Sequence, residues 1–306
     1  MVKMLLTGGS GMVGRNLQEH PGISKWDLYA PTSSELDLTD TFAVYEYIKN
    51  LSPNIVVHCA GKVGGIQANI NSPVTFLDQN ITIGRNVVMG SFLSGVKNFI
   101  NLASTCIYPR EASNPLTEDM VLTGSLEETN EGYALAKIST LRLCQYIRKE
   151  DPSFIYKSII PCNLFGRYDH YDSIKSHLLP AIIKKVYDAK MNSSDHVEIW
   201  GDGSARREFM CCNDLADILI RAASDLTKVP DLMNAGIGHD YSVLEYYQKV
   251  SEVIGWDGKF KFDISKPKGM KQKLCDVSRL HDWGWSSKIS LEQGIEIAYK
   301  YFLEAK

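Results

Sequence analysis

The chain has 306 residues, 44% of them hydrophobic and 23% charged, which is enough to bury a large core in one or two domains. A net charge of −3, with lysine and arginine scattered along the chain, excludes a broad attraction to nucleic acid or to an anionic membrane. No apolar run approaches the roughly 20 residues of a membrane-spanning helix, and the N-terminus lacks the layout of a secretory signal. Seven cysteines in no zinc-binding pattern predict reduced thiols, no metal site and a cytoplasmic protein.

A glycine turn follows the first predicted strand, residues 3–7, and leads directly into a helical pattern. The first glycine of such a turn permits the tight bend, the middle one lets the backbone approach a pyrophosphate, and the last allows close packing of helix on strand. The diphosphate then lies at the helix N-terminus. The turn therefore predicts dinucleotide binding, with a simple glycine-rich turn as the alternative. The predicted cofactor contacts in this segment are Gly8, Ser10, Gly11, Met12 and Gly14.

The second predicted strand ends near Ala30 and carries no acidic residue to bind the ribose diol of NAD. The hydroxyl residues Thr32, Ser33 and Ser34 follow and leave space for a 2′-phosphate. NADPH (NADP) is therefore the predicted cofactor, and NAD is less favoured. Asp37 is predicted either to accept a hydrogen bond from the adenine amine or to contribute to the cap of a helix that begins near residue 41.

Strand and helix patterns alternate as far as residue 166. The predicted strands are 54–60, 97–103 and 156–160, and the predicted helices are 73–94 and 133–149. This alternation of strands and helices predicts an α/β fold with a Rossmann-like doubly wound parallel sheet. A flexible glycine-rich loop, residues 61–65, follows one strand at the edge where such sheets bind ligands, and Ala60 is a predicted cofactor contact there.

From about residue 167 the elements become shorter and the alternation less regular. Helices are predicted from 177, at 213–226, 242–254 and 287–304, and strands at 197–200, 231–235 and 259–262. We expect residues 1–166 to form the cofactor-binding domain, with residues of about 207–240 returning to it. Residues 167–306 are expected to form mainly a smaller α/β substrate-binding domain, and 168–176 a surface loop.

Tyr133 and Lys137 are four residues apart in a helical pattern, so their side chains share one helix face. A lysine cation favours the phenolate and lowers the phenol pKa from its usual value of about 10. The pair is then suited to proton transfer in a carbonyl–alcohol conversion. The spacing is common by itself, and an ordinary amphipathic helix is the alternative.

Over nearly its whole length the chain resembles the extended short-chain dehydrogenases/reductases. The glycine turn and the Tyr133/Lys137 pair are general to that family. Two further strings are typical of its members that epimerise and reduce GDP-linked 4-keto-6-deoxy sugars. These strings are Lys-Val-Gly-Gly-Ile at 62–66 and Ser-Thr-Cys-Ile-Tyr-Pro at 104–109. Other matching stretches are 122–127, 129–137, 161–166, 176–180, 200–203, 207–209 and 273–277.

The resemblance implies roles for two groups of residues. Ser104, Tyr133 and Lys137 would form the reductase triad, in which the serine hydroxyl holds the substrate carbonyl and the tyrosine protonates it. Cys106 would be the epimerase base, as a thiolate favoured by a nearby cation, and His177 the acid. Cysteine and histidine titrate near 8.5 and 6.5, at about the working pH. From the residues alone, a strand-end serine, a buried cysteine and a helix-start histidine are the favoured descriptions.

The resemblance also implies a GDP-linked 4-keto-deoxy sugar as substrate and a homodimer. The dimer would form through a four-helix bundle of the helix before Gly95 and the helix bearing Tyr133. Arginine and lysine suit the diphosphate, an indole suits the guanine, and an amide suits the sugar or the nicotinamide cofactor. The implied substrate contacts are Asn163, Lys184, Lys185, Trp200, Arg207 and Lys273, and Asn163 is also an implied cofactor contact.

Three departures from the family pattern leave the sugar and cofactor open. Ser10 stands where some members carry an arginine, and no arginine follows the second strand. Lys184 and Lys185 replace a frequent arginine pair. Residues 167–171 read Arg-Tyr-Asp-His-Tyr where Gly-Pro-His-Asp-Asn-Phe is usual.

The leading interpretation is 3,5-epimerisation and C4 reduction of GDP-4-keto-6-deoxy-mannose to GDP-L-fucose. The alternative is C4 reduction, with or without epimerisation, of a related GDP-linked 6-deoxy-heptose or 3,6-dideoxy-hexose. A non-catalytic dinucleotide sensor is a remote alternative, which the intact Tyr133/Lys137 pair disfavours.

Overall fold

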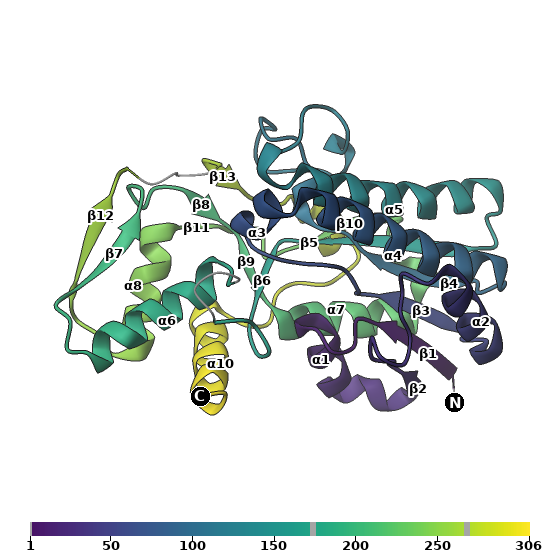
Figure 1. Ribbon diagram of the computed structural model, residues 1–306, viewed down its shortest axis with the longest axis horizontal. Coiled ribbons are helices and arrows are strands. Elements are labelled where there is room, and N and C mark those ends of the chain that lie inside the picture. The colour runs from purple at the N-terminus through teal and green to yellow at the C-terminus, as the bar shows by residue number, and fades with distance from the viewer. Residues whose placement is uncertain (1, 172–175, 266–269) are drawn as a thin grey trace.

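The computed structural model describes residues 2–171, 176–265 and 270–306, which form a larger and a smaller lobe (Figure 1). The larger lobe is built on a six-stranded parallel sheet in the order β2–β1–β3–β4–β5–β10, which confirms the predicted doubly wound fold. Its strands are β1 (Val2–Thr7), β2 (Trp26–Tyr29), β3 (Ile55–His58), β4 (Asn98–Leu102), β5 (Ile155–Pro161) and β10 (Leu232–Ala235). Part of the predicted surface loop, residues 172–175, lies outside the described residues.

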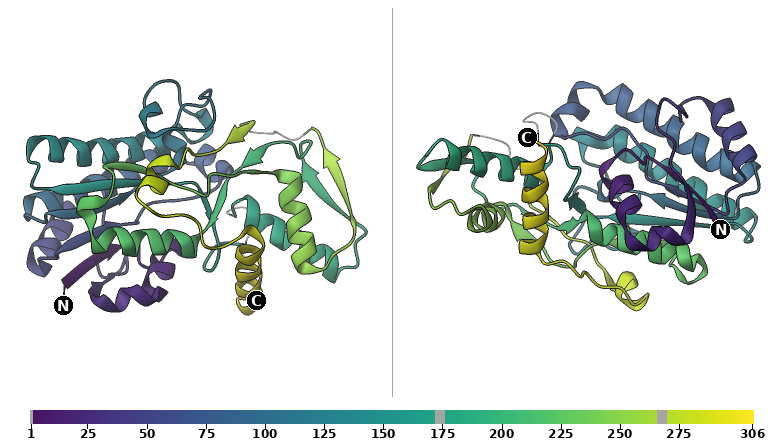
Figure 2. Two further views of the ribbon diagram at one scale, coloured as in Figure 1. Left: turned by 180° about the vertical axis from the view of Figure 1, so that it is seen from behind. Right: turned by 90° about the horizontal axis from the view of Figure 1, so that it is seen from below.

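Helices cover both faces of this sheet (Figures 1 and 2). On one face lie α2 (Thr41–Leu51), α4 (Pro73–Leu93) and α5 (Glu131–Glu150), and on the other lie α1 (Met12–Glu19) and α7 (Cys212–Ser224). Side chains of each strand alternate between the two layers: Leu5 packs with the first group, whereas Met4 and Leu6 pack with the second. Burial on both faces explains why the inner strands read as uninterrupted apolar runs.

The smaller lobe packs three helices around one apolar core beside a parallel strand pair. The helices are α6 (Leu178–Met191), α8 (Val243–Ile254) and α10 (Leu291–Glu304), and the strands are β7 (His196–Trp200) and β12 (Lys259–Asp263). Capping boxes at Ser242 and Ser290 fix the first residues of α8 and α10. Across the described part of the chain, none of the helices is long and apolar enough to span a membrane.

Several short elements join distant segments and were not predicted. They are α3 (Ile66–Asn71), α9 (Ser278–Asp282), β6 (Asn163–Phe165), β8 (Arg206–Arg207), β9 (Phe209–Cys211), β11 (Tyr241–Ser242) and β13 (Gln272–Lys273). β6 pairs with β9, and β8 lies between β11 and β13, so that Arg207 is opposite Lys273. Strands of two or three residues show no periodicity, and their formation depends on partners far away in the chain.

The buried carboxylate of Glu208 connects these segments. Its side chain is fully buried and accepts hydrogen bonds from the backbone N–H groups of Ile237 (2.6 Å), Gly238 (2.8 Å) and Cys275 (2.8 Å). Burial raises the pKa of Glu208, and these hydrogen bonds oppose the rise. One side chain therefore links the segment after β10 to the segment after β13.

Replacing Glu208 by glutamine tests this connection. The amide keeps the shape of the side chain but presents an NH₂ group where one of the backbone donors needs an acceptor. We expect the free energy of unfolding to fall by about 1–3 kcal/mol, the cost of an unsatisfied buried donor. Urea denaturation followed by circular dichroism measures the change. Glu296→Gln, an exposed substitution on α10, is the control, and an equal effect of both substitutions would contradict the role of Glu208.

Candidate active site

The carboxyl ends of β1, β3 and β4 meet at one edge of the sheet, where β1 lies between β2 and β3 and the chain order reverses. Two glycines of the turn after β1 are required by close contacts. Gly8 has a φ of +77°, and a Cβ atom there would lie 2.7 Å from the backbone nitrogen of Ala60. A Cβ atom on Gly14 would lie 2.2 Å from the Gly8 carbonyl oxygen.

Helix α1 begins at Met12 directly after this turn. Gly11 is its N-cap and supplies no side-chain hydrogen bond, so backbone N–H groups of the first turn stay available to an anion. A tight turn, a closely packed helix and free N–H groups together fit the pyrophosphate of a dinucleotide.

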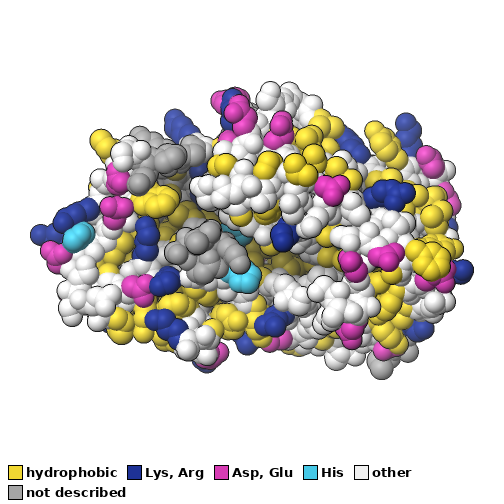
Figure 3. All heavy atoms as spheres, viewed as in Figure 1, with side chains coloured by type: hydrophobic (Ala, Val, Ile, Leu, Met, Phe, Trp, Pro, Cys, Tyr) yellow, Lys and Arg dark blue, Asp and Glu magenta, His cyan; other side chains and the backbone are white. Residues whose placement is uncertain are grey.

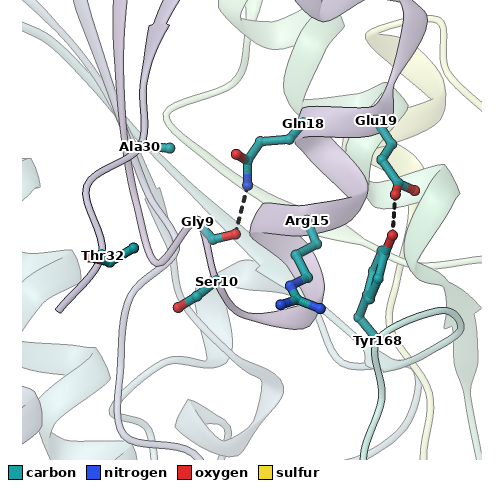
Figure 4. A pocket seen from close by; sticks show the side chains of 8 residues that line it. All are labelled: Gly9, Ser10, Arg15, Gln18, Glu19, Ala30, Thr32 and Tyr168. Atoms are coloured by element: carbon teal, nitrogen blue, oxygen red, sulfur yellow. Dashed lines mark hydrogen bonds between the residues drawn. The ribbon is translucent and has the colours of Figure 1, made fainter. Parts of the chain in front are cut away.

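A pocket of about 380 Å³ lies beside the turn (Figure 4). Its lining includes Gly9, Ser10, Arg15, Glu19, Thr32 and Tyr168. Sequence reasoning missed Arg15 and Tyr168, because the first lies on an exposed helix position and the second belongs to the loop after β6, more than one hundred residues away.

Asp37 closes a local turn instead of capping α2. Its carboxylate accepts hydrogen bonds from the backbone N–H (2.8 Å) and the hydroxyl (2.7 Å) of Thr39, which lower its pKa. The cap of α2 is Asp40, which accepts a hydrogen bond from the Ala43 N–H. The predicted helix-cap alternative for Asp37 is therefore wrong.

Lys137 is buried at the centre of the site, with 7% of its surface exposed. Its ammonium group donates a 2.9 Å hydrogen bond to the carbonyl of Leu102, the last residue of β4, and lies 5.8 Å from the ring centre of Tyr133. A Cβ atom on Gly61 would lie 3.7 Å from the same ammonium nitrogen. Lys137 thus joins the Tyr133 helix to the ends of β3 and β4.

The pKa of Tyr133 does not follow the prediction from the Tyr/Lys spacing. Burial raises this pKa, the nearby Cys106 thiol adds to the rise, and a hydrogen bond with the Ser104 hydroxyl opposes it. The phenol is therefore neutral at physiological pH, which is the form that can donate a proton. The interactions also show that the side chains of Ser104, Cys106 and Tyr133 are close together.

Cys106 is buried in the short helical turn after β4, with 6% of its surface exposed. Burial raises the pKa of its thiol, and Lys273, Ser104 and Lys137 oppose the rise. Burial lowers the pKa of Lys273, and the Cys106 and Cys275 thiols oppose that fall. The burial of the thiol favours its protonated form, whereas the positive charges of Lys273 and Lys137 favour the thiolate that the resemblance implies.

His177 is the N-cap residue of α6. Packing around its imidazole lowers its pKa, as does the charge of His170. Within the described residues, no hydrogen bond links this imidazole to Cys106. Helices α5 and α6 both begin near the middle of the molecule, where the lobes meet (Figure 1), and Figure 3 shows that this face is hollowed there, with histidine side chains exposed.

The predicted nucleotide-sugar residues fall into three groups. Arg207 and Lys273 lie opposite one another on β8 and β13, and Arg207 donates to the Met270 carbonyl. Lys185 lies 5.2 Å from the ring centre of the exposed Trp200. The other two are engaged elsewhere: Lys184 pairs with Asp188, and Asn163 donates to the Glu208 carbonyl.

Sequence reasoning also missed the role of Asn80 on α4. Its side-chain oxygen accepts a 2.8 Å hydrogen bond from the Lys62 N–H, and its amide donates to the Lys62 carbonyl at 3.0 Å. Asn80 thereby holds the glycine-rich loop after β3 against the larger lobe. Over the described ranges, no cluster of three or more histidine, cysteine or acidic side chains could hold a metal ion.

Comparison with known proteins gives consistent matches. The model of the NAD dependent epimerase/dehydratase family matches residues 4–236. A GDP-L-fucose synthase of Azorhizobium caulinodans is 50% identical, with 98% of this chain and 96% of the relative covered. A GDP-L-colitose synthase of Yersinia pseudotuberculosis is 47% identical, with coverage of 100% and 99%. The solved GDP-mannoheptose C4 reductase of Campylobacter jejuni, with NADP bound, is 29% identical, has a TM-score of 0.89 and is covered over 98% of its chain and 99% of this one.

The electrostatic interaction between Lys273 and Cys106 predicts a change in thiol titration. In Lys273→Met the ammonium that favours the thiolate is lost, so the Cys106 pKa should rise further. The pH profile of Cys106 alkylation by iodoacetamide, followed by peptide mass spectrometry, should shift to higher pH. Lys271→Met, which removes an exposed charge two residues away, should leave the profile unchanged. An identical profile in all three proteins would show that Lys273 does not act on the thiol.

Proposed function

The chain belongs to the NAD dependent epimerase/dehydratase family, and we propose that it is an NADPH-dependent epimerase/reductase that converts GDP-4-keto-6-deoxy-mannose to GDP-L-fucose. The observation that carries this proposal is the convergence of Ser104, Cys106, Tyr133, Lys137 and Lys273 at the carboxyl edge of the sheet. The similarity to a GDP-L-fucose synthase over almost the whole of both chains supports the choice of sugar.

NADPH is the proposed cofactor, and when bound it supplies the hydride for C4 of the sugar. Gly8, Ser10, Gly11, Met12, Gly14 and Ala60 would hold it. Asp37 would accept a hydrogen bond from the adenine amine. The relative solved with NADP bound supports this choice of cofactor.

For the reduction, the Tyr133 phenol would donate its proton to the C4 oxygen while the Ser104 hydroxyl holds that oxygen. The resulting phenolate would be stabilised by the Lys137 ammonium, 5.8 Å from the ring centre. Burial raises the pKa of Tyr133 and so favours the neutral phenol, which supports a role as acid rather than base in this direction.

For the epimerisation, Cys106 would remove the proton from C3 or C5, which the adjacent C4 carbonyl acidifies. The electron pair would move onto the C4 oxygen, and His177 would return a proton to the opposite face of the carbon. Cys106 must first lose its own proton, and the positive charges of Lys137 and Lys273 favour that loss.

The two lobes would divide the binding of the ligands. Residues 1–166 and about 207–240 would bind the cofactor, and the rest of 167–306 would bind the GDP sugar. Lys273, beside Cys106, would contact the sugar, Arg207 the diphosphate, and Trp200 with Lys185 the guanosine end. Lys184 and Asn163 would act mainly through their contacts within the protein. The seven unpaired cysteines are consistent with a cytoplasmic protein.

A second candidate function is C4 reduction of a different GDP-linked sugar. The 47% identical GDP-L-colitose synthase supports a dideoxy-hexose as the substrate. The GDP-mannoheptose C4 reductase of similar structure supports a heptose. The substrate would then be a GDP-linked 4-keto-3,6-dideoxy-hexose or 6-deoxy-heptose. Residues 167–171 are the segment that differs from the usual family pattern, and they precede His177 closely in the chain. A different sugar at this site would leave the C4 reduction chemistry unchanged.

Isotope labelling tests the proposed chemistry. The protein is incubated with NADPH and GDP-4-keto-6-deoxy-mannose in deuterated water, and the product is analysed by NMR. We expect NADPH oxidation and deuterium at both C3 and C5. Tyr133→Phe should slow the reduction by about 10²–10⁴-fold because the proton donor is lost. Cys106→Ala should still reduce C4 but leave C3 and C5 unlabelled.

Parallel incubations with the dideoxy and heptose substrates distinguish the candidates. A higher kcat/KM for either one would replace the fucose assignment while keeping the reductase. NADPH oxidation at the wild-type rate by Tyr133→Phe would refute the triad, and labelling by Cys106→Ala would refute the epimerase base.

A homodimer through α4 and α5 forms part of the proposal. Leu135 and Tyr146 are 39% and 58% exposed, and their separation of eleven residues places them on one face of α5. Leu93 is exposed on α4. Two copies of this helix pair would form a four-helix bundle.

Sedimentation equilibrium tests the dimer. The wild type should have twice the 34.3 kDa mass of one chain. The double substitution Leu135→Glu and Tyr146→Glu places charges in the contact and should give the monomer mass. Leu303→Glu, on the exposed side of α10, should leave the mass at that of the dimer. A monomeric wild type would exclude this part of the proposal.

A further inference from the structure

The pocket beside the glycine turn contains one cation that has no partner of opposite charge. Of the eight described residues that line it, only Arg15 carries a positive charge. In the described part of the chain its guanidinium makes a ring contact with Tyr168, 4.9 Å from the ring centre, but no hydrogen bond or ion pair. Figure 4 shows the Arg15 side chain extended between Ser10 and the Tyr168 ring.

The acidic residue of the pocket is neutralised by other groups. The Glu19 carboxylate accepts a 2.7 Å hydrogen bond from Arg167 and a second one from the Tyr168 hydroxyl. Arg167 also lies 5.0 Å from the Tyr168 ring centre. Glu19 and Arg167 balance each other, so the charge of Arg15 remains available to a ligand.

Tyr168 holds this arrangement in place. It adopts φ +68°, which a non-glycine residue keeps only when its surroundings fix it. Its ring packs against Tyr301 of α10 and against both guanidinium groups. An arginine stacked on an aromatic face is restricted in orientation, so it loses less entropy when it binds an anion.

The other side of the pocket is formed by Ala30 and Thr32, directly after β2. In a dinucleotide fold the adenosine ribose lies between the end of the second strand and the glycine turn. A cation at this place meets the 2′-phosphate that distinguishes NADPH from NADH. Glu35 is the competing feature, since its carboxylate accepts hydrogen bonds from the backbone N–H and the hydroxyl of Thr32.

We propose that Arg15, held by Tyr168, is the residue that selects NADPH by binding its 2′-phosphate. It would replace the arginines that the chain lacks in the glycine turn and after the second strand. The inference deepens the proposed function, because it rests on the use of NADPH by the same site. Through Tyr168, the loop after β6 would then form part of the cofactor pocket, although it belongs to the part of the chain expected to bind the substrate.

Binding measurements test the proposal without catalysis. Calorimetric titrations use NADPH, NADH, adenosine 2′,5′-bisphosphate and AMP, so that each pair differs only in the 2′-phosphate. Arg15→Ala should weaken the binding of NADPH and of the bisphosphate by about tenfold or more, because a charge-assisted contact is lost. It should change the affinity for NADH and AMP by less than about threefold. Arg15→Lys should be intermediate, because it keeps the charge and loses the planar fork. Lys25→Ala, an exposed cation outside the pocket, is the matched control.

Two outcomes overturn the proposal. In the first, Arg15→Ala weakens the binding of both members of each pair equally. In the second, the wild type binds NADH more tightly than NADPH, as the Glu35 carboxylate would favour. Both differ from a failure of the proposed function. In that case the wild type would bind NADPH selectively through Arg15 and yet leave all three GDP-keto sugars unreduced.

Discussion

A buried ammonium group fixes the geometry of the site. Lys137 is taken out of water and donates to the carbonyl that ends β4, so α5 cannot slide along the sheet without leaving a buried charge unsatisfied. That contact sets Tyr133 over the residues that follow β4. Burial lowers the Lys137 pKa, and the thiols of Cys106 and Cys59 oppose the fall. One lysine thus orders the three segments whose side chains meet there.

The second half of the site comes from the far end of the chain. The charge of Lys273 acts on Cys106 from β13, which pairs with β8. The buried Glu208 supports this pairing by accepting a hydrogen bond from the Cys275 N–H, two residues after Lys273. The position of Lys273 therefore depends on the buried carboxylate of Glu208.

The sequence predicted the features that depend on neighbours along the chain. The glycine turn, the apolar strands and the amphipathic helices were visible because each has its own spacing. The short strands β8 and β13 were missed because their formation depends on each other. The predicted direction of the Tyr133 pKa shift was wrong for a related reason. The spacing identified the nearby lysine, but burial dominates the shift, and burial is a property of the folded chain. Arg15 was missed because it occupies an exposed helix position, and its ring contact with Tyr168 forms only when a distant loop folds against α1.

The repeated crossing of the chain between the lobes limits how this fold can diversify. Helix α7 provides much of one layer over the parallel sheet, and β10 provides its edge, although both follow the first segment of the smaller lobe. A recombination event with a single breakpoint after residue 166 would strip the sheet of that layer, so the lobes cannot be inherited as separate modules. Changes confined to loops, such as residues 167–171, leave these layers over the sheet in place. Two relatives named for different sugars align with this chain over 99% and 96% of their own length.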